Sequence, residues 1–552
     1  MEKRYFLALL LAAAVVAITQ IVFPVARTNP KAAAKGDTVV SSELPRVDQQ
    51  PVSSAEVLQS ITPAKTSDSA QLTSPSGEVT TLVTPWSTYR FSSLGAAPMS
   101  ITLKQYKNLA PTGGMVELGA AGQPLLKYAL VVNGDTIHLD RVPFFSHLIG
   151  NPTEGGSLVY EATVTSLHVT IAYEFVPTSY VVRIKGKVDG ASGNTYLLTQ
   201  LPTSLRPAEA DTVADLRNLA FSFKPQRENA RIVGFNSLDP GEQRLETGPL
   251  TWAAVKNKYF VLGLLNPEGS SFNEVALKGG PRTSKVATNA LATIVKALKD
   301  GSFTLDLYAG PQQSTQLIAM GRDFDHVNPY GWRFLQGVVQ PIAALCIRLL
   351  LWMHQVLRLS YGWVLVIFGV LIRVALWPLN QSAMRSSMKM QEIQPKLAEA
   401  QKKYKDKPEK QREEIMKVYK EAGASPFTAL TGCLPALIPM PVLFALFFVF
   451  QNTIEFRGVP FLWLHDISIK DPLYILPVLM GISMYVLSWI GLRNAPPNPQ
   501  AKMMSYMFPV MMTFILANMA SGLNLYYTAQ NIAAIPQQWL LANERARRKR
   551  PA

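Results

Sequence analysis

The run YGWVLVIFGVLIRVALWPLN, residues 361–380, is apolar over the ~20 residues that a helix needs to cross a bilayer. It contains one charged residue, Arg373. At a rise of about 1.5 Å per residue, Arg373 lies roughly 18 Å from Tyr361 and roughly 10 Å from Asn380. A charge at that depth is costly and usually functional. We therefore expect Arg373 either to snorkel to a membrane surface or to face a water-filled cavity inside the membrane.

Four further apolar segments are long enough to span the membrane. Ser521 and Gly522 separate the last two, because one straight helix through both would be far too long. None of the four contains Asp or Glu, so the spans offer no carboxylate partner for Arg373. We expect a core of five membrane-spanning helices over residues 359–542. The four segments are 430–450, 473–492, 503–519 and 522–541.

The chain begins with another apolar segment, residues 5–23, which follows Lys3 and Arg4. The run is long for a signal peptide and no clear small-x-small site follows it closely, so residues 1–24 are expected to be an uncleaved anchor. A cleaved signal peptide is the alternative. Basic residues before the segment place the N-terminus in the cytoplasm. Residues 25–77, rich in Ala, Ser, Thr, Pro and Lys, are typical of a flexible periplasmic linker.

Residues 78–330 have the pattern of a β domain. Short alternating runs are separated by Gly, Pro, Asn and Asp, and helical stretches are few. This pattern predicts a large antiparallel β-sandwich, which lies outside the cytoplasm if the N-terminus is inside. The predicted strands are 88–94, 100–106, 125–132, 157–164, 168–175, 180–188, 258–265 and 302–308.

Residues 331–358 are expected to form an amphipathic helix that lies in the membrane interface. The stretch 338–357 is nearly long enough to span, but Gln340, Arg348 and Gln355 lie near one helical face. If it spanned, the basic region 383–425 would lie outside the cytoplasm, against the positive-inside rule.

Residues 383–425 are dense in Lys, Arg and Glu and carry two apolar stripes on either side of Pro408. This predicts a cytoplasmic two-helix hairpin with a narrow apolar seam; a solvated charged linker is the alternative. The tail 543–552 is strongly basic and marks cytoplasmic topology or contacts anionic lipid or RNA. The stripes are Met390, Ile393, Leu397, Ala400 and Tyr404, then Ile415, Val418 and Ala422.

Composition and missing motifs narrow the possible functions. The net charge of +15 suits an anionic membrane surface or RNA. Cys346 and Cys433 both lie in membrane-associated segments, so the β region has no disulfide framework. The sequence has no GxxxxGK[ST] phosphate loop and no HExxH metal motif, and its six histidines show no ligand spacing. We expect no metal, nucleotide or other cofactor, and no enzymatic activity.

The last predicted span is polar for a membrane helix. Asn524, Tyr527 and Asn531 recur at i, i+3 and i+7, with Thr528 beside them. Hydrogen bonding between helices is one interpretation of this stripe. Together with Arg373, the stripe favours the other interpretation, a polar cavity shared by two helices.

Two spans have unusual apolar surfaces. The 430–450 span has three prolines between 435 and 441, which prevent a straight, fully bonded helix. In the 503–519 span, Met504, Met507 and Met511 share a face. Methionine surfaces adapt to varied apolar partners, although ordinary core packing explains them equally well.

Several segments resemble, in order and spacing, the YidC family of membrane protein insertases. The resemblance covers the chain from about Tyr330 onward and is specific there. WAAVKNKYF at 252–260 and LYAGPQ at 307–312 look more loosely like the periplasmic domain of Gram-negative members. The specific segments are IRVALWPLNQSAMRSSMKMQEIQPKL (372–397), GCLPALIPMPVLFALFFVF (432–450), DPLYILPVLMGISM (471–484) and SGLNLYY (521–527).

The resemblance implies a fold and a site. The fold is a five-helix insertase core plus an N-terminal anchor helix, with a supersandwich-like periplasmic β domain. The core encloses a hydrophilic groove that is open to the cytoplasm and to lipid and closed outside. Combined with the polar stripe, the expected substrate-groove residues are Arg373, Asn524, Tyr526, Tyr527, Thr528 and Asn531.

The resemblance also implies an apolar slide for the emerging helix and a cytoplasmic loop that recruits substrate and targeting machinery. The slide residues are Pro435, Leu437, Ile438, Met440, Pro441, Phe444, Met504, Met507, Phe508 and Met511. The recruitment residues are Met390, Leu397, Tyr404 and Lys405.

The expected function is to pass nascent membrane proteins from the cytoplasm into the bacterial inner membrane without ATP hydrolysis. The implied partners are nascent chains, the Sec translocon, the ribosome, the signal-recognition targeting machinery and the lipid bilayer. A small-solute transporter is one alternative, but the spans have no carboxylate for ion coupling and no internal repeat. A membrane-anchored periplasmic glycan enzyme is the other, and fold alone does not decide function.

Overall fold

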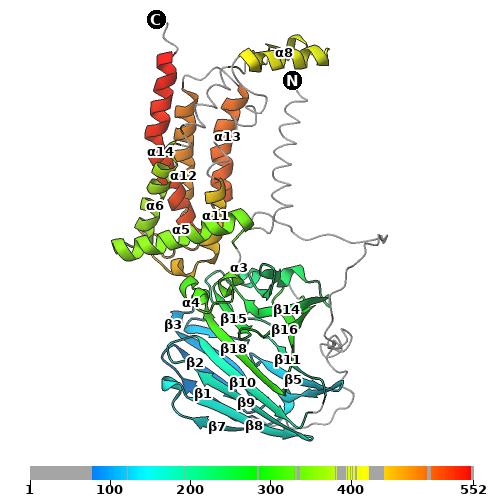
Figure 1. The fold of residues 1–552 in the computed structure, drawn as a ribbon. Coiled ribbons are helices and arrows are strands. Elements are labelled where there is room, and N and C mark those ends of the chain that lie inside the picture. The colour runs from blue at the N-terminus through cyan, green and yellow to red at the C-terminus, as the bar shows by residue number, and fades with distance from the viewer. Residues whose placement is uncertain are drawn as a thin grey trace. The chain divides into compact units, whose positions relative to one another are not determined.

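The computed structural model describes most of the chain from Gly77 to Arg548. The described residues divide into two compact units. The first contains most strands, and the second contains 222–231, 256–264 and the chain from Tyr308 onward, with most of the helices (Figure 1). The predicted anchor 1–24 and almost all of the linker 25–77 lie outside the described residues. Also outside are 121, 192, 283–284, 329, 332–335, 379–380, 382–392, 394–395, 398, 401, 405–406, 422–439, 494–498 and 549–552.

The strands form two sheets. The smaller sheet has the order β1-β2-β3-β4, with β1 Val79–Val83, β2 Ser87–Ser92, β3 Ala97–Lys107 and β4 Met115–Leu118. The larger, 14-stranded sheet follows the path β6-β5-β11-β17-β16-β14-β15-β18-β10-β9-β8-β7, with β12 and β13 paired off this path. Its strands are β5 Lys127–Val132, β6 Asp135–His138, β7 Phe145–Ile149, β8 Ser157–Val164, β9 Leu167–Phe175, β10 Val181–Asp189, β11 Thr195–Gln200, β12 Ala220–Pro225, β13 Arg231–Gly234, β14 Gln243–Lys256, β15 Phe260–Leu265, β16 Phe272–Gly279, β17 Ala290–Ala297 and β18 Ser302–Pro311.

All eight predicted strands are present, with ends that differ by a few residues. The alternation that predicted them is the alternation of burial, because successive side chains in a strand point to opposite faces. In β10, for example, Ile184 is buried whereas Arg183 and Lys185 are exposed. β9 and β10 pair antiparallel in an unbroken register from Phe175↔Val182 to His168↔Asp189.

Aromatic side chains join the two sheets face to face. The Phe91 ring of β2 lies 4.7 Å from the Tyr173 ring of β9, and the Tyr89 ring lies 5.2 Å from the Phe175 ring. The Tyr173 hydroxyl donates a hydrogen bond of 2.6 Å to the Ala96 carbonyl, which satisfies its buried polar end. These contacts confirm the predicted sandwich core.

The helices of the second unit follow the predicted segments closely. Several ends differ by a few residues, and α11 is described only from Met440 onward. α6 ends at Ala375, five residues before the predicted end, and Leu376 lies in a turn. α14 continues to Arg548, through the residues predicted as a separate tail, because Ala, Glu and Arg are good helix formers. The helices are α4 Ser314–Ala319, α5 Gln336–Leu357, α6 Tyr361–Ala375, α8 Pro408–Glu421, α11 Met440–Asn452, α12 Ile475–Leu492, α13 Pro499–Leu516 and α14 Ser521–Arg548; α3 Thr212–Arg217 belongs to the first unit.

Small residues allow the helices of this unit to approach closely. A Cβ on Gly369 of α6 would lie 3.0 Å from the Tyr526 carbonyl oxygen and 3.3 Å from Ala529 Cβ, both on α14. A Cβ on Gly481 of α12 would meet Thr513 Oγ1 of α13. In Figure 1, α6, α12, α13 and α14 lie side by side, and α5 lies across them. Such small-residue contacts are typical of helix packing in membranes.

Two helices, α5 and α12, are long and apolar enough to cross a membrane by length and composition. Shorter apolar helices cover Tyr361–Ala375, Val442–Asn452 and Lys502–Leu516. α5 buries Cys346 and Leu350 against the other helices and leaves Arg348 exposed. Its crosswise placement against the other helices in Figure 1 agrees with an interfacial helix, which stays a prediction.

The charged hairpin has the predicted apolar seam. Ile393 and Leu397 pack with Tyr419, and Ile415 and Val418 cover the same cluster. Tyr404 lies in the turn that follows the first helix instead of within it, since Lys407 N donates to the Tyr404 carbonyl. Met390, Lys405 and Ala422 lie outside the described residues.

Gly369→Leu tests the contact between α6 and α14. We expect it to lower unfolding stability by about 1–3 kcal/mol, because the side chain has no space beside the α14 backbone. The neighbouring Val370 is exposed, so Val370→Leu is the matched control and should change little. Thermal unfolding in lipid nanodiscs measures both; equal melting temperatures for the two variants would contradict the described packing.

Candidate functional site

Arg373 lies in the last turn of α6 and faces α14. Its Nη2 donates a hydrogen bond of 2.9 Å to Gln537 Oε1. Gln537 Nε2 in turn donates a 3.0 Å bond to the Trp377 carbonyl. Gln537 is only 1% exposed, so this amide is held between the two helices. A neutral amide, rather than a carboxylate, is therefore the partner of the guanidinium.

The guanidinium keeps unused hydrogen-bonding capacity. Within the described part of the chain, Arg373 Nε is buried without a hydrogen-bond partner, and no carboxylate lies within ion-pair distance of the side chain. Burying a charge without an opposite charge is costly, so such sites are rarely retained for stability alone. A guanidinium presents its donors in a planar fork that matches a carboxylate. The guanidinium is therefore a candidate anion-binding group.

The polar stripe of α14 bonds mainly to its neighbours. Asn524 Nδ2 donates to the Leu516 carbonyl of α13 at 3.0 Å, and Asn531 Nδ2 donates to Ser483 Oγ of α12 at 3.0 Å. Thr528 Oγ1 donates to the Asn524 carbonyl at 2.8 Å. These contacts favour the interhelical interpretation for Asn524 and Asn531.

The two tyrosines of α14 differ in environment. Tyr526 is fully buried, with its ring 5.9 Å from the Phe368 ring of α6. Tyr527 is half-buried, and the two tyrosine rings lie 5.3 Å apart. Tyr526 therefore belongs to the α6–α14 contact, on the side of α14 that also carries Gln537.

A second polar stripe was not recognised from the sequence. Tyr526, Gln530 and Gln537 recur at i, i+4 and i+11 on α14, which is one helical face. Gln530 and Gln537 are both buried. The sequence does contain a signal for this stripe, because Gln530 and Gln537 lie within an otherwise apolar predicted span. The polar residues of the stripe that begins at Asn524 are more closely spaced, so the prediction was based on that stripe instead.

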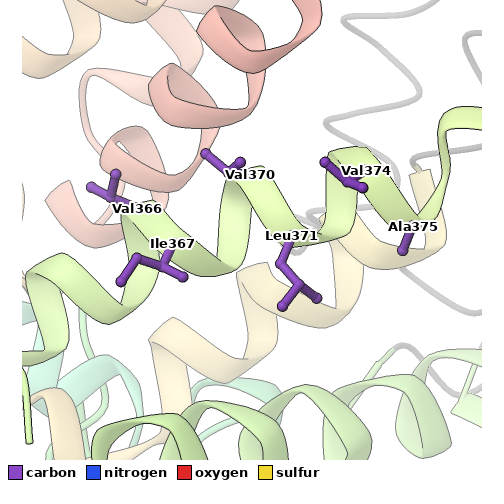
Figure 2. Close-up of a pocket in the computed structure, with 6 residues that line it drawn as sticks. All are labelled: Val366, Ile367, Val370, Leu371, Val374 and Ala375. Atoms are coloured by element: carbon purple, nitrogen blue, oxygen red, sulfur yellow. The ribbon is translucent and has the colours of Figure 1, made fainter. Parts of the chain in front are cut away.

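α6 also presents an apolar hollow of about 500 Å³ (Figure 2). Its lining residues in the described part of the chain are all apolar. α6 thus carries a half-buried charge and an apolar surface within the same few turns. The lining residues are Val366, Ile367, Val370, Leu371, Val374 and Ala375.

The described slide residues offer an apolar surface on α13. Met504, Met507 and Phe508 are exposed and Met511 is half-buried. Phe444 of α11 is half-buried against the helical core. Their role as a slide stays a prediction. Pro435, Leu437 and Ile438 lie outside the described residues, and α11 begins at Met440 and Pro441, whose side chains are not described.

The loop before α12 holds two helix starts together. Asp471 Oδ2 accepts from Leu476 N at 2.8 Å, and its Oδ1 accepts from Trp463 Nε1 at 3.2 Å. Ser521 N donates to the Ile469 carbonyl at 2.7 Å, which ties α14 to the same loop. In this loop, burial raises the pKa of Glu455 to about 6. These hydrogen bonds tie the loop to the N-terminal ends of α12 and α14.

These observations define a class of protein: a helical membrane core with a half-buried arginine, joined to a large antiparallel β domain. Two family models match the chain, "60Kd inner membrane protein" over residues 352–549 and "YidC periplasmic domain" over residues 80–345. The membrane protein insertase YidC of Chlorobaculum tepidum is 32% identical over 485 residues, 82% of this chain and 79% of the relative. The chain belongs to the YidC family of membrane protein insertases.

Other proteins named YidC are also similar to this chain. The membrane protein insertase YidC of Chlorobium phaeovibrioides is 33% identical over 417 residues, covering 70% of this chain and 69% of the relative. A crystal structure of an active YidC insertase with its first transmembrane domain resolved aligns with a TM-score of 0.33 at 17% identity. That alignment covers 84% of this chain and 94% of the other. The family assignment depends on the sequence matches, which make this chain an inner membrane protein with a periplasmic domain.

A double-mutant cycle of Asn531→Ala and Ser483→Ala tests the interhelical bond. We expect a coupling energy of about 0.6 kcal/mol, the average found by double-mutant cycles on such bonds within one membrane protein. Reversible unfolding of the two single variants and the double variant measures it. Additive effects would show instead that Asn531 serves a hydrated surface, as the polar-cavity interpretation holds.

Proposed function

We propose that this chain inserts membrane proteins by receiving the short polar tail of a nascent chain beside Arg373. Family membership supports the activity. The observation that carries the site is the guanidinium of Arg373, which is bonded to the Gln537 amide at 2.9 Å and has no carboxylate within ion-pair distance among the described residues. The substrate class is a membrane protein whose translocated tail is short and contains acidic residues.

The first step is capture of the tail. A carboxylate of the tail pairs with the guanidinium fork in two parallel hydrogen bonds, a stronger interaction than the single bond to Gln537. The partly buried setting strengthens the attraction relative to water. The carboxylate of the tail therefore replaces its contacts with water by contacts with Arg373 before the tail crosses the rest of the hydrocarbon core.

The second step is release of the adjoining apolar segment into lipid. The apolar side chains of α13, with Met504, Met507 and Phe508 exposed, give this segment a continuous surface to follow. Transfer of the segment supplies the driving force, at about 25 cal/mol per Å² of apolar surface removed from water. The membrane potential adds about 2.3 kcal/mol per negative charge and 100 mV. No ATP hydrolysis is needed.

The proposed topology places both termini and the hairpin 383–425 in the cytoplasm of a bacterial cell and the β domain in the periplasm. The basic end of α14 and the charged hairpin support it through the positive-inside rule. On that side the hairpin, through Met390, Leu397, Tyr404 and Lys405, receives the ribosome and the targeting machinery. The Sec translocon is a further proposed partner in the membrane.

Insertion into liposomes that contain only the purified chain tests the function. The substrate is a single-span protein with a short acidic N-terminal tail, scored by protease protection of the tail. We expect insertion by the unmodified chain, at least about tenfold less by Arg373→Ala, and retention by Arg373→Lys, since 1.4 kcal/mol of lost attraction is tenfold.

Gln537→Ala is the matched control, because it removes the partner amide and keeps the positive charge. It should retain insertion. An acidic tail should insert better than a basic tail of equal length. Equal insertion by Arg373→Ala and the unmodified chain would show that the charge is not part of the mechanism. No insertion by the folded unmodified chain would show that it does not insert substrates on its own.

A further inference from the structure

Among the described residues, Glu455 has a buried carboxyl group with no ion-pair partner. It lies in η5, Ile454–Phe456, the short helix that follows α11. Both carboxyl oxygens are buried and make no regular hydrogen bond, although the backbone N–H groups of Glu455 and Ser314 partly stabilise its charge. The nearby Arg457 places its guanidinium over the Phe260 ring, 5.3 Å from the ring centroid. An ionised carboxylate is costly in such a setting.

The described titratable groups around Glu455 do not offset its negative charge. The phenols of Tyr330 and of Tyr361, at the start of α6, are close enough for this charge to act on them. Burial raises the pKa of Tyr330 to about 12, so this phenol is neutral at physiological pH. Asp325 adds a second acidic group near Tyr330, and the His354 ring of α5 stacks on the Tyr361 ring at 4.0 Å. Burial therefore favours the neutral form of the Glu455 carboxyl group.

Hydrogen bonds connect the chain around Glu455 to the start of α14. The Val459 carbonyl accepts a bond of 3.0 Å from Ile467 N, and the Ile467 carbonyl accepts a bond of 2.9 Å from Gly522 N. The loop 453–471 thus contacts the first turn of α14 directly. A change in the position of Glu455 acts on the same loop.

We propose that protonation of Glu455 controls how often the loop 453–471 opens. With the carboxyl group neutral, the loop is closed and its bonds to α14 are intact. With the carboxyl group ionised, the closed loop keeps a charge away from water, and opening hydrates that charge. The ionised form therefore opens the loop more often and loosens the first turn of α14. This regulation does not depend on the insertion activity.

The direction of the pH dependence follows from the two states of the loop. Burial raises the pKa of Glu455 from its ordinary value of 4.5 to about 6 in the closed loop. The closed loop therefore binds the proton more tightly than the open loop, in which the carboxyl group is hydrated. Closure is favoured at low pH, and this contribution is lost as the pH rises from 4.5 through about 6.

Hydrogen exchange of the full chain in lipid nanodiscs, at about pH 5 and about pH 7.5, tests the regulation. Each rate is divided by the intrinsic exchange rate of that amide at the same pH. We expect the amides of Ile467 and Gly522 to open about tenfold more often at the higher pH, because the carboxyl group is then ionised. Glu455→Gln keeps the shape and removes the ionisation, so its two values should agree within about twofold. The exposed Glu154 supplies the matched control Glu154→Gln, which should keep the difference of the unmodified chain.

Infrared difference spectroscopy reads the proton directly. The carbonyl band of a protonated carboxyl group should titrate with a midpoint of about 6 in the unmodified chain and in Glu154→Gln, and Glu455→Gln should lack this component. Circular dichroism checks that each variant is folded, and Glu455→Asp, which still titrates, should keep a pH-dependent opening. Equal opening at both pH values in the unmodified chain, or a pH dependence that Glu455→Gln leaves intact, would overturn the proposal.

Discussion

The arginine of α6 is a half-buried positive charge that no carboxylate of the described residues neutralises. Its charge is partly desolvated, and its direct partner is the single amide of Gln537. This constraint determines much of the helical unit. α14 must bring Gln537 to within hydrogen-bond distance of α6, and Gly369 allows that approach by leaving no Cβ between the helices. Under the proposed function, the cost of this half-buried charge is retained because the charge attracts the acidic tail of a substrate.

The helical unit presents two kinds of surface, one polar and one apolar. Tyr526, Gln530 and Gln537 form the polar face of α14 toward α6, while α6 carries an apolar hollow and α13 exposes methionines and Phe508. Under the proposed function, the polar tail of a substrate meets the first of these surfaces and its apolar segment meets the second. The ordered loop at Asp471 and Ile469 ties the starts of α12 and α14 together, so the bundle has one end held by hydrogen bonds.

The sequence predicted the elements better than their contacts. Alternation located the eight strands, and apolar length located α6, α12 and α14, because these patterns follow from local geometry. Gln537 was missed as the partner of Arg373, since the two are 164 residues apart and only the helix packing brings them together. Asn524 and Asn531 were identified as polar, but periodicity alone could not separate hydration from bonds to α13 and α12.

The central claim is that the translocating tail passes the charged contact between α6 and α14. The most direct measurement places a photo-cross-linker beside an acidic residue in the tail of a stalled nascent chain and maps the cross-linked peptides of this protein. The account predicts cross-links to α6 near Arg373 and to α14 between Tyr526 and Gln537. Cross-links confined to lipid, or to the outward face of α14 at Ile532 and Trp539, would contradict it.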